Sequence, residues 1–469
     1  MKRIDFIKSV SIWAIGNSVL PLVANNHLGV FSVEDSLNWT LIMPSDKLYP
    51  QLNQGFNSRI KKTPKCIALV KNTEGVSEAI KYAIKNGLQV TVKSGGHSFE
   101  GFSSNNGGLV INLSELNSIE WLGSKMVKVG PGCRLGQLYN ELLPQKRLIP
   151  AGSCATVGIG GLALGGGYGF FSRQYGLTCD SLKAITMVDG QGNVVDSQNN
   201  SELLWACRGG NTGNFGVVTS MTFETHPAPA RFTSIRFKSY QLTPNKTKQL
   251  MKAWFEMASL LPATCFSAFV LNGKTNIILI TDYGNQTAKI RQITKALSQL
   301  ADKIQFGKPE PLATALKTFY GIQTPIRFKN ASCGLYKNFQ QIEPFIETAF
   351  AKISSTPGMI YQVMTLGGAI NSPEFEKNSC YPHRNIPYLS ELQTYWDRDS
   401  QSQPLLERFD QIQRLFTQNG LTAQYVNYPD LNLKNWETAY FGENYNRLRA
   451  VKKRYDPDNL IRHEQSIKP

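Results

Sequence analysis

The sequence has no pair of cysteines in the CxxC spacing, and its eight cysteines lie far apart along the chain. Structural zinc sites usually need such pairs, so we expect no zinc cluster and no other metal site. Long hydrophobic runs are missing as well. No stretch approaches the roughly 18 consecutive apolar residues that a membrane-spanning helix requires, so we expect no integral membrane contact.

Acidic residues are scarce relative to basic ones. The chain contains 34 Asp and Glu against 50 Lys and Arg, which gives a formal net charge of +16. An excess of this size suggests an anionic partner, and nucleic acid has to be considered. The basic residues are scattered, however, without a run of five or more, and no common nucleic-acid-binding motif occurs. We therefore expect no nucleic-acid partner, whereas an anionic cofactor, an acidic polymer or a membrane surface would each fit the charge.

The length of the chain indicates more than one domain. With 469 residues it is long for a single compact core, and two or three domains are expected. Hydrophobic residues make up 41% and charged residues 18%. This balance is typical of a globular protein rather than a disordered one.

The first residues have the order of features found in a secretory signal. The start is positively charged, residues 9–23 are mostly apolar, and Ala24 offers a small residue at a cleavage point. This order predicts a signal peptide over residues 1–24 and export to the periplasm or out of the cell. A buried first helix is the alternative.

The order of the expected strands and helices favours an α+β fold. In the first half, a helix that Thr73 caps and Gly87 stops is expected between two strands. The expected strands are 66–70, 89–93, 109–113 and 126–129, with helices at 73–84 and 135–143 and a hairpin at 184–196.

From about residue 230 onward, strands alternate with amphipathic helices. Two strands flank an Asn-Gly turn at residues 272–273, which is a hairpin signal. The expected strands are 266–271, 276–281, 359–366 and 388–396, and the expected helices are 246–260, 286–301, 338–353, 401–418 and 434–454.

Glycine is concentrated in residues 150–180, PAGSCATVGIGGLALGGGYGFFSRQYGLTCD, and two more glycine-rich loops occur at 94–97 and 208–216. Backbone N–H groups can approach a ligand closely where no Cβ atom intervenes, and successive N–H groups form a nest for an anion. A diphosphate is the natural occupant of such loops. Because the long stretch does not open a simple strand–helix unit, we do not expect a Rossmann fold.

Four segments resemble the berberine bridge enzyme family, a branch of the vanillyl-alcohol oxidase flavoproteins. They are VKSGGHSFEG, PAGSCATVGIGGLALGGGYG, RGGNTGNFGVVT and the tail from YVNYPDLNLKNW to YDPDNLIRHEQSI. The segments occur in the family's order over residues from about 50 to 469. The resemblance implies a PCMH-type FAD-binding domain at 50–230, completed by a berberine-bridge-type C-terminal segment at 421–469. Residues 231–420 would form a substrate domain whose antiparallel sheet, covered by helices, roofs the isoalloxazine.

The same resemblance implies that FAD is bound covalently at two positions. His97 matches the histidine linked to the flavin 8α-methyl group, and Cys154 matches the cysteine linked to flavin C6. Two tethers would fix the isoalloxazine, raise its reduction potential and leave room for an open substrate cleft. The other positions that match the cofactor-binding motifs are Lys93, Ser94, Gly95, Gly96, Ser98, Val157, Gly158, Gly160, Gly161, Gly165, Gly166, Gly167, Asn214, Gly216, Val218 and Asn427.

Val157 resembles the residue that gates oxygen in this family. A small valine is associated with oxidases and a leucine with dehydrogenases, so we expect O2 to be the electron acceptor. The chain departs from the family pattern at Lys93 and Phe99, where relatives commonly carry arginine and tyrosine, and at Asn211, which replaces a glycine. Phe99 lacks a hydroxyl that would contact substrate, which weakens any detailed substrate analogy.

Oxidation of an alcohol by a flavin needs a base for the hydroxyl proton, and three residues are candidates. Tyr428 matches the tyrosine base of carbohydrate-oxidising relatives, and Tyr168 resembles an active-site tyrosine beside the flavin. Glu391 resembles the glutamate base of berberine bridge enzyme, and on a strand it shares one face with Leu389 and Gln393. A free tyrosine has a pKa of about 10, whereas burial would raise the pKa of a glutamate toward neutrality. The sequence leaves the choice open.

These observations predict an FAD-dependent oxidase that acts on a small molecule and passes the electrons to O2. The preferred reaction converts the anomeric hydroxyl of a sugar or oligosaccharide to a lactone and releases H2O2. The alternative is a tailoring oxidase of an alkaloid, polyketide or phenolic alcohol, which Glu391 and Phe99 slightly favour. A flavin-binding protein without turnover is the remaining hypothesis.

Overall fold

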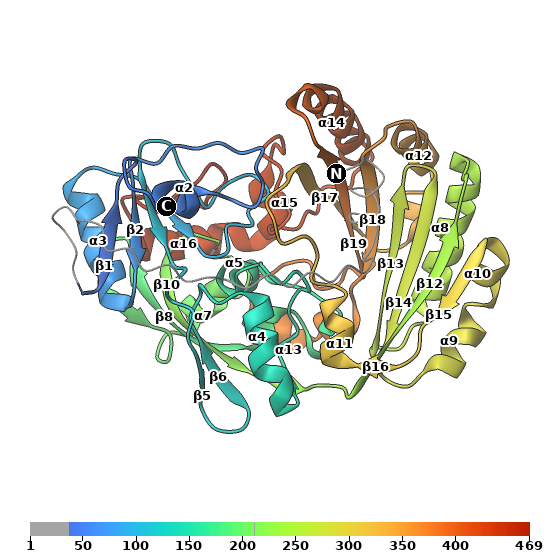
Figure 1. The fold of residues 1–469 in the computed structure, drawn as a ribbon, viewed down its shortest axis with the longest axis horizontal. Helices are drawn as coiled ribbons and strands as arrows, with labels where there is room; N and C mark the ends of the chain where they lie inside the picture. Colours follow the sequence, from blue (N-terminus) through green and yellow to red (C-terminus); the bar gives the residue numbers. More distant parts are fainter. Residues whose placement is uncertain (1–36, 211) are drawn as a thin grey trace.

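The computed structural model describes residues 37–210 and 212–469. The predicted signal peptide, residues 1–24, and Asn211 lie outside these ranges, so export stays a prediction from the sequence. Within the described ranges, no helix combines the length and the apolar character needed to cross a membrane. Figure 1 shows two parts: the C-terminal segment (red) returns to the part built from the first residues (blue to green), and the segments coloured from lime to brown form the other.

A four-stranded sheet lies at the outer end of the first part. Its strands, in the order β1-β2-β4-β3, are β1 (Trp39–Ile42), β2 (Cys66–Val70), β4 (Leu109–Asn112) and β3 (Val90–Lys93). The last three strands are parallel, with helix α3 (Thr73–Lys85) as the crossover, while α2 (Tyr49–Asn53) precedes β2. Asn72, rather than the predicted Thr73, caps α3, because its side chain accepts a hydrogen bond from the Gly75 N–H.

A second sheet, of five antiparallel strands, packs beside the first. Its strands, in the order β5-β6-β10-β8-β9, are β5 (Ile119–Trp121), β6 (Met126–Val129), β10 (Gly216–Glu224), β8 (Leu182–Asp189) and β9 (Val194–Asp196). A separate pair consists of β7 (Arg147–Leu148) and β11 (His226–Pro227). The helices of this region are α4 (Leu135–Leu142), α5 (Ile159–Leu164), α6 (Ser172–Tyr175) and α7 (Ser201–Cys207). Strand and helix residues share one apolar core, to which Val129, Leu138 and Phe223 belong.

An eight-stranded antiparallel sheet forms the second part, in the order β15-β12-β14-β13-β18-β19-β17 with β16 beside β12. Helices α8 (Pro244–Ser259), α12 (Ile346–Ser354) and α14 (Ser402–Gln418) cover one face and bury a core that includes Trp254 and Phe269 (Figure 1). The strands are β12 (Arg231–Ser239), β13 (Cys265–Asn272), β14 (Thr275–Asp282), β15 (Lys303–Phe306), β16 (Glu310–Pro311), β17 (Arg327–Tyr336), β18 (Met359–Thr365) and β19 (Tyr388–Trp396). The smaller helices are α9 (Thr287–Ile293), α10 (Lys295–Leu300), α11 (Leu312–Lys317) and α13 (Pro373–Asn378).

Two helices predicted in the second half are shorter than the sequence pattern suggests. The stretch 286–301 divides into α9 and α10 at Thr294, whose hydroxyl bonds back to the Ile290 carbonyl at 2.7 Å. The stretch 338–353 divides into a 3₁₀ turn at Phe339–Gln341 and α12, because Pro344 between them has no N–H to donate within a helix. Each departure is caused by one residue, Thr294 or Pro344, whose effect the spacing of apolar residues does not reveal.

The predicted helix over 434–454 also divides, into α15 (Trp436–Phe441) and α16 (Tyr445–Tyr455). Gly442 separates them with a φ of +54°, which lies in the left-handed region and ends a right-handed helix. The turn redirects the chain, so that α16 lies near α7 in the first part (Figure 1). The end of the chain thereby returns to the sheets built from its beginning.

A buried lysine anchors this C-terminal segment. Lys452 donates hydrogen bonds to the Asp456 carboxylate at 2.6 Å and to the carbonyls of Asn214 and Ile461 at 2.7 and 2.6 Å. Lys452 and Asp456 are fully buried, so removing either partner would leave an unpaired charge in the interior. Ile461 also bridges to Val90 at the start of β3. With these sheets and covering helices, the predicted α+β class is confirmed.

Candidate active site

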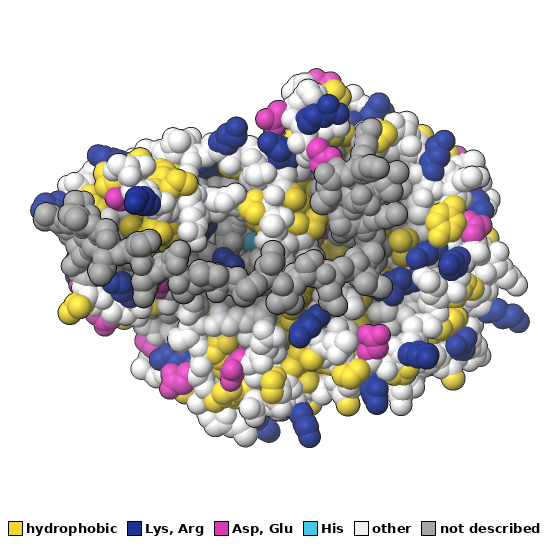
Figure 2. All heavy atoms as spheres, in the orientation of Figure 1, with side chains coloured by type: hydrophobic (Ala, Val, Ile, Leu, Met, Phe, Trp, Pro, Cys, Tyr) yellow, Lys and Arg dark blue, Asp and Glu magenta, His cyan; other side chains and the backbone are white. Residues whose placement is uncertain are grey.

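A cavity of about 1140 Å³ lies between the two parts of the molecule. Loops of the first part form one wall, within residues 94–103 and 152–170, and residues 425–429 of the C-terminal segment adjoin them. The opposite wall is the face of the eight-stranded sheet that the large helices leave uncovered. Figure 2 shows a hollow near the middle of this view, with a histidine side chain inside it. The same view shows Lys and Arg scattered over the surface rather than gathered in one block.

Two glycine-rich loops of the first wall touch backbone to backbone. A Cβ atom on Gly95 would lie 2.3 Å from the Gly158 nitrogen, and a Cβ atom on Gly158 would lie 2.1 Å from Ser94 Oγ. Any larger residue would have to push the loops apart, so both positions require glycine. The contact joins the loop after β3 to the loop before α5, and it sets the relative position of the side chains that the two loops carry.

His97 lies on the first of these loops. Its Nε2 atom is 2.9 Å from the Thr156 hydroxyl of the second loop, and its ring stacks on Phe56 with the centroids 4.1 Å apart. Burial, reinforced by the charge of Arg134, lowers the pKa of His97 to about 3. The imidazole is therefore neutral at physiological pH, and a neutral imidazole carries a nitrogen lone pair that can act as a nucleophile.

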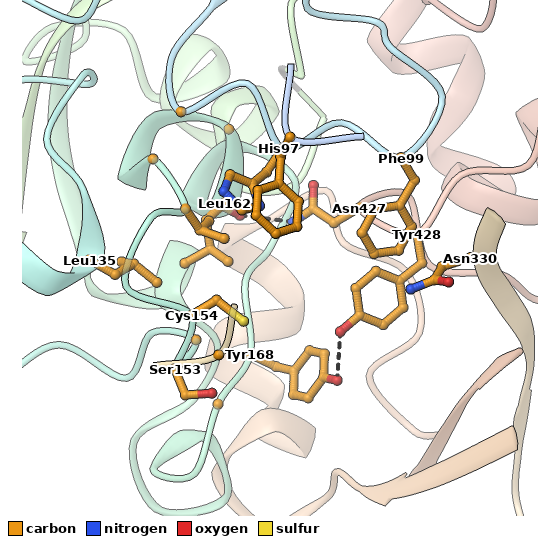
Figure 3. A pocket seen from close by; sticks show the side chains of 18 of the residues that line it. His97, Phe99, Leu135, Ser153, Cys154, Leu162, Tyr168, Asn330, Asn427 and Tyr428 are labelled. Carbon is orange, nitrogen blue, oxygen red and sulfur yellow. Dashed lines mark hydrogen bonds between the residues drawn. The ribbon is translucent and has the colours of Figure 1, made fainter. Parts of the chain in front are cut away.

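Cys154 lies on the second loop and faces the cavity (Figure 3). Its side chain is exposed to this space, whereas every other cysteine of the chain is buried. Protein atoms nevertheless enclose the cavity, and this burial, together with the charge of Glu391, raises the pKa of the Cys154 thiol to about 11. The thiol is therefore protonated at neutral pH.

Most of the residues predicted to contact a cofactor line this cavity. They are Ser94, Gly95, Gly96, His97, Ser98, Cys154, Val157, Gly158, Gly160, Gly161, Gly216, Val218 and Asn427. The residues predicted to be catalytic line the same cavity, and they are Tyr168, Glu391 and Tyr428. The fold thus brings side chains from distant parts of the sequence to one space.

The remaining predicted cofactor residues do not line the cavity; they are Lys93, Gly165, Gly166, Gly167 and Asn214. The Lys93 ammonium donates to the carbonyls of Leu52 and Gln54, at 2.5 and 2.6 Å, and burial lowers its pKa to about 8. The Asn214 side chain accepts a hydrogen bond from the Ile467 N–H at 2.9 Å. Both side chains therefore stabilise the surrounding structure rather than face the cavity.

The glycines at 165–167 support the cavity wall from behind. A Cβ atom on Gly165 would lie 2.1 Å from Asn427 Oδ1, and one on Gly167 would lie 2.5 Å from Thr178 Oγ1. Gly167 also has a φ of +77°, which a residue with a side chain rarely adopts. Gly165 thereby allows close packing against Asn427, whose amide donates to the Leu162 carbonyl at 3.0 Å (Figure 3).

Tyr168 and Tyr428 meet inside the cavity, with their hydroxyl oxygens 2.8 Å apart (Figure 3). Tyr168 also donates to the sulfur of Met364 on the sheet, and the Tyr428 ring stacks on Phe99 with the centroids 5.1 Å apart. Burial, with a contribution from the charge of Glu391, raises the pKa of both tyrosines well above the usual value. Both hydroxyls are therefore protonated at neutral pH. Each donates to a protein atom in this structure, and a ligand oxygen that displaces the Met364 sulfur or the partner hydroxyl can accept the hydrogen bond instead.

Glu391 lies on β19, opposite Gln362 of β18. It is only 3% exposed, and the Gln362 amide donates to its Oε2 atom at 2.5 Å. Burial raises the pKa of Glu391 to about 7, although the side-chain amides of Gln393, Gln362 and Asn330 partly offset this. A carboxyl group with this pKa exchanges its proton near neutral pH, which suits a general base. Gln393 also lines the cavity, whereas Leu389 does not.

Several polar residues of the sheet wall were not identified from the sequence, among them Asn330, Gln362 and Tyr395. The Asn330 amide donates to the Tyr395 hydroxyl at 2.9 Å, while its buried Oδ1 atom has no hydrogen-bond partner among the described residues. An unpaired acceptor on a cavity wall suits a hydroxyl donor on a ligand. The sequence does contain a signal that could have identified such residues. It is a polar residue among apolar ones on the same face of a strand, such as Gln362 between Ile360 and Met364.

Comparisons with known proteins match this arrangement. Residues 64–198 match an FAD-binding domain, and residues 424–468 match the berberine and berberine-like family. Chitooligosaccharide oxidase of Gibberella zeae is 32% identical, over 88% of this chain and 89% of that protein. Aclacinomycin-N/aclacinomycin-A oxidase of Streptomyces galilaeus is 27% identical, over 90% of this chain and 89% of that protein. The solved structure of a variant of BBE-like 1 from Physcomitrella patens has a TM-score of 0.84 and 25% identity, covering 92% of this chain and 96% of that one.

The loop wall fits an FAD molecule. A Cβ atom at Gly161 would have no other atom within 4 Å, so this glycine leaves open space inside the cavity. Glycines with freely approachable backbone N–H groups suit a diphosphate, and Gly96, with a φ of +70°, turns the loop beside His97. The cavity also exceeds the roughly 300–1,000 Å³ of ordinary ligand pockets, which leaves room for a dinucleotide and a second molecule.

We predict that Gly95→Ala destabilises the protein by about 1–3 kcal/mol or more, because the added methyl group overlaps the backbone of the neighbouring loop. The measurement is the unfolding midpoint in denaturant. Gly161→Ala is the matched control, since it adds the same methyl group in the same wall where the space is open. Equal stability of the two variants would show that the close contact of Gly95 with Gly158 does not constrain the loops.

Proposed function

This chain belongs to the berberine bridge enzyme-like family of FAD-linked oxidoreductases, and on that premise we propose that it oxidises an alcohol or lactol carbon, preferably of a sugar or oligosaccharide. The observation that carries the proposal is Glu391, a buried carboxyl group with a pKa of about 7 that faces the cavity among amides and phenols. We further propose that residues 50–230 and 421–469 bind FAD and that residues 231–420 bind the substrate.

FAD, when bound, would supply a two-electron acceptor for the hydride of the substrate carbon, with O2 as the final acceptor and H2O2 as the product. The proton of the hydroxyl group attached to that carbon goes to the Glu391 carboxylate, which the Gln362 amide holds in place. Tyr168 and Tyr428 stay protonated, so they orient the substrate oxygen by donating hydrogen bonds. A lactol treated in this way becomes a lactone. The small side chain of Val157 on the cavity wall supports the access of O2.

We also propose that His97 and Cys154 both carry covalent links to the flavin, at the 8α-methyl group and at C6. Both side chains line the loop wall of one cavity. The neutral His97 ring and the cavity-exposed Cys154 thiol are the nucleophiles that such links require. Their loops are held together by the contact between Gly95 and Gly158, so both would reach the same flavin ring system.

A polyhydroxylated substrate fits the surroundings of Glu391. The Gln362, Gln393 and Asn330 amides lie on the same face of the sheet, and the unpaired Asn330 Oδ1 atom can accept a hydrogen bond from a sugar hydroxyl. A relative with 32% identity is named for the oxidation of chitooligosaccharides, which supports the same class. These amides are the groups that favour a sugar over an apolar alcohol.

A second candidate function has its own observation. Farther along the sheet, the cavity face carries apolar side chains, including Ala268, Val270 and Leu279. In addition, the side chain that packs against Tyr428 is Phe99, which lacks the hydroxyl group of the tyrosine commonly found at this position in relatives. An extended apolar surface suits a polycyclic or phenolic alcohol. A relative with 27% identity is named for the oxidation of aclacinomycin rather than of an oligosaccharide. A tailoring oxidase of a secondary metabolite is therefore the alternative.

Incubating the purified yellow protein with panels of sugars, oligosaccharides and polycyclic alcohols tests the proposed function. We expect H2O2 to form with at least one oligosaccharide and a lactone to accumulate in equal amount. Peroxide with the polycyclic alcohols alone would favour the second candidate. Flavin bleaching without peroxide, under air, would contradict the assignment of O2 as acceptor.

The rate of flavin reduction should depend on the ionisation of Glu391. Below pH 7 the carboxyl group is mostly protonated and cannot accept a proton, so the rate should rise about tenfold per pH unit and level off above about pH 7. Glu391→Gln should lower the rate by roughly 10²–10⁴-fold and remove this dependence. The measurement is anaerobic bleaching of the flavin absorbance after rapid mixing. Glu256→Gln, an exposed change on α8, should behave as the wild type. An unchanged pH profile in Glu391→Gln would move the role of base elsewhere.

Denaturation in acid tests the covalent links. The wild-type protein should precipitate as a yellow pellet, His97→Ala and Cys154→Ala should each keep flavin through the other link, and the double variant should release it. Ser153→Ala, beside Cys154 on the same wall, is the control and should keep both links. Mass analysis of flavin peptides identifies the linked residues. A colourless wild-type pellet with a yellow supernatant would exclude covalent attachment.

A further inference from the structure

The cavity continues along the sheet, away from Glu391. In the antiparallel register, Met364 of β18 lies opposite Ala268 of β13, Ala268 opposite Leu279 of β14, and Leu279 opposite Arg236 of β12. All of these residues line the same cavity as Glu391. Since β12 is separated from β19 by four strand spacings, Arg236 lies about 19 Å from Glu391 across the sheet. Figure 1 shows β12 and β15 at the side of the sheet remote from β17.

This remote end of the cavity is basic. Arg236, Lys308 and Lys317 line it, and Glu310 is the carboxylate beside them. The only other carboxylate on the described cavity walls is Glu391, at the far side of the sheet. The cavity is therefore polar and proton-accepting at one end, apolar along its middle and positively charged at the other end.

The positive charge at the remote end is incompletely balanced. Arg236 is half-buried and senses the charge of Glu310, yet its guanidinium group forms no ion pair or hydrogen bond with any described residue. Nearby, Lys238 of β12 lies directly opposite Lys303 of β15, and like charges at directly opposed positions repel. Burial, together with the charges of Arg236 and Lys303, lowers the pKa of Lys238. These two lysines lie outside the cavity lining and add to the positive charge of this end of the sheet.

An ordinary solvated surface accounts for Lys308 and Lys317, because both are exposed. It does not account for Arg236, which shares the cavity face with apolar Leu279 and has no carboxylate within ion-pair distance among the described residues. A guanidinium group in such a wall matches the two oxygens of a carboxylate in a fork-like geometry. The separation from Glu391 places this anion several sugar rings away from the carbon that is oxidised.

We propose that the substrate is an acidic oligosaccharide that carries a carboxylate at the end remote from the oxidised carbon, and that Arg236 binds this carboxylate. Lys308 and Lys317, at the exposed rim, add attraction for the same charge. The inference rests on the proposed oxidation of a sugar and specifies its substrate class. Arg236 is then a specificity residue, and it takes no part in the chemical step.

Two tetrasaccharides with the same linkages and the same reducing-end hexose test this proposal. One is neutral, and the other has a hexuronic acid at the non-reducing end. With the holoenzyme and peroxide as readout, KM should be about tenfold lower for the acidic substrate, and Arg236→Gln should abolish this preference. In the variant, kcat for both substrates and KM for the neutral one should stay unchanged, because the substitution lies far from the reacting carbon.

Lys252→Gln is the matched control, since it removes one positive charge from α8 on the opposite face of the sheet. It should leave both KM values unchanged, and added salt should raise KM for the acidic substrate alone. Equal KM values in the wild type, or an Arg236→Gln effect of the same size on both substrates, would overturn the proposal.

A separate measurement distinguishes this proposal from the proposed function. If neither tetrasaccharide is oxidised, the assignment of a sugar oxidase fails. Calorimetric titration of the holoenzyme with the acidic tetrasaccharide then tests separately whether Arg236 binds the carboxylate. Binding that Arg236→Gln weakens about tenfold would support the anion site alone. Absent binding, or binding that the substitution leaves unchanged, would overturn it.

Discussion

Where Gly95 meets Gly158, two loops from distant parts of the chain touch with no side chain between them. This close approach places the loop of His97 against the loop of Cys154, and the bond between His97 and the Thr156 hydroxyl follows from it. A methyl group at either glycine would separate the loops and turn one continuous wall into two unrelated segments. The geometry of the cofactor side of the cavity therefore depends on two positions that carry no functional group of their own.

The opposite wall is held to the first by buried charge. Lys329 of β17 binds the Glu100 carboxylate and, at 2.7 Å, the Asp430 carboxylate, and all three side chains are buried. The two carboxylates outweigh the effect of burial and raise the pKa of Lys329. Because Glu100 follows the His97 loop and Asp430 follows Tyr428, this network joins the sheet, the loop wall and the C-terminal segment. Loss of any one partner would leave unpaired charge in the interior, so the two walls keep a fixed separation.

The sequence was most informative where structure depends on local pattern. The strand Tyr388–Trp396 and the α+β class follow from alternation and element order, and the glycine loops follow from composition. It could not give the direction of the Lys93 side chain, which is long enough to reach either side of its strand. Nor could the sequence identify Gln362 or Asn330 as site residues, because a single amide side chain on a strand belongs to no recognisable sequence motif. Only the pairing of β18 with β19 brings Gln362 to Glu391, and pairing is a property of the folded sheet.

The C-terminal segment supplies Asn427 and Tyr428 to the cavity, and Ile461 bridges to Val90 in the first sheet. During translation the early sheets are made long before the residues that complete them, because Val90 is synthesised far ahead of Ile461. The pocket for the cofactor cannot close until this later segment has left the ribosome. Cofactor capture is thus a late step of biogenesis, and a truncation that removed Asn427 and Tyr428 would remove part of the pocket wall.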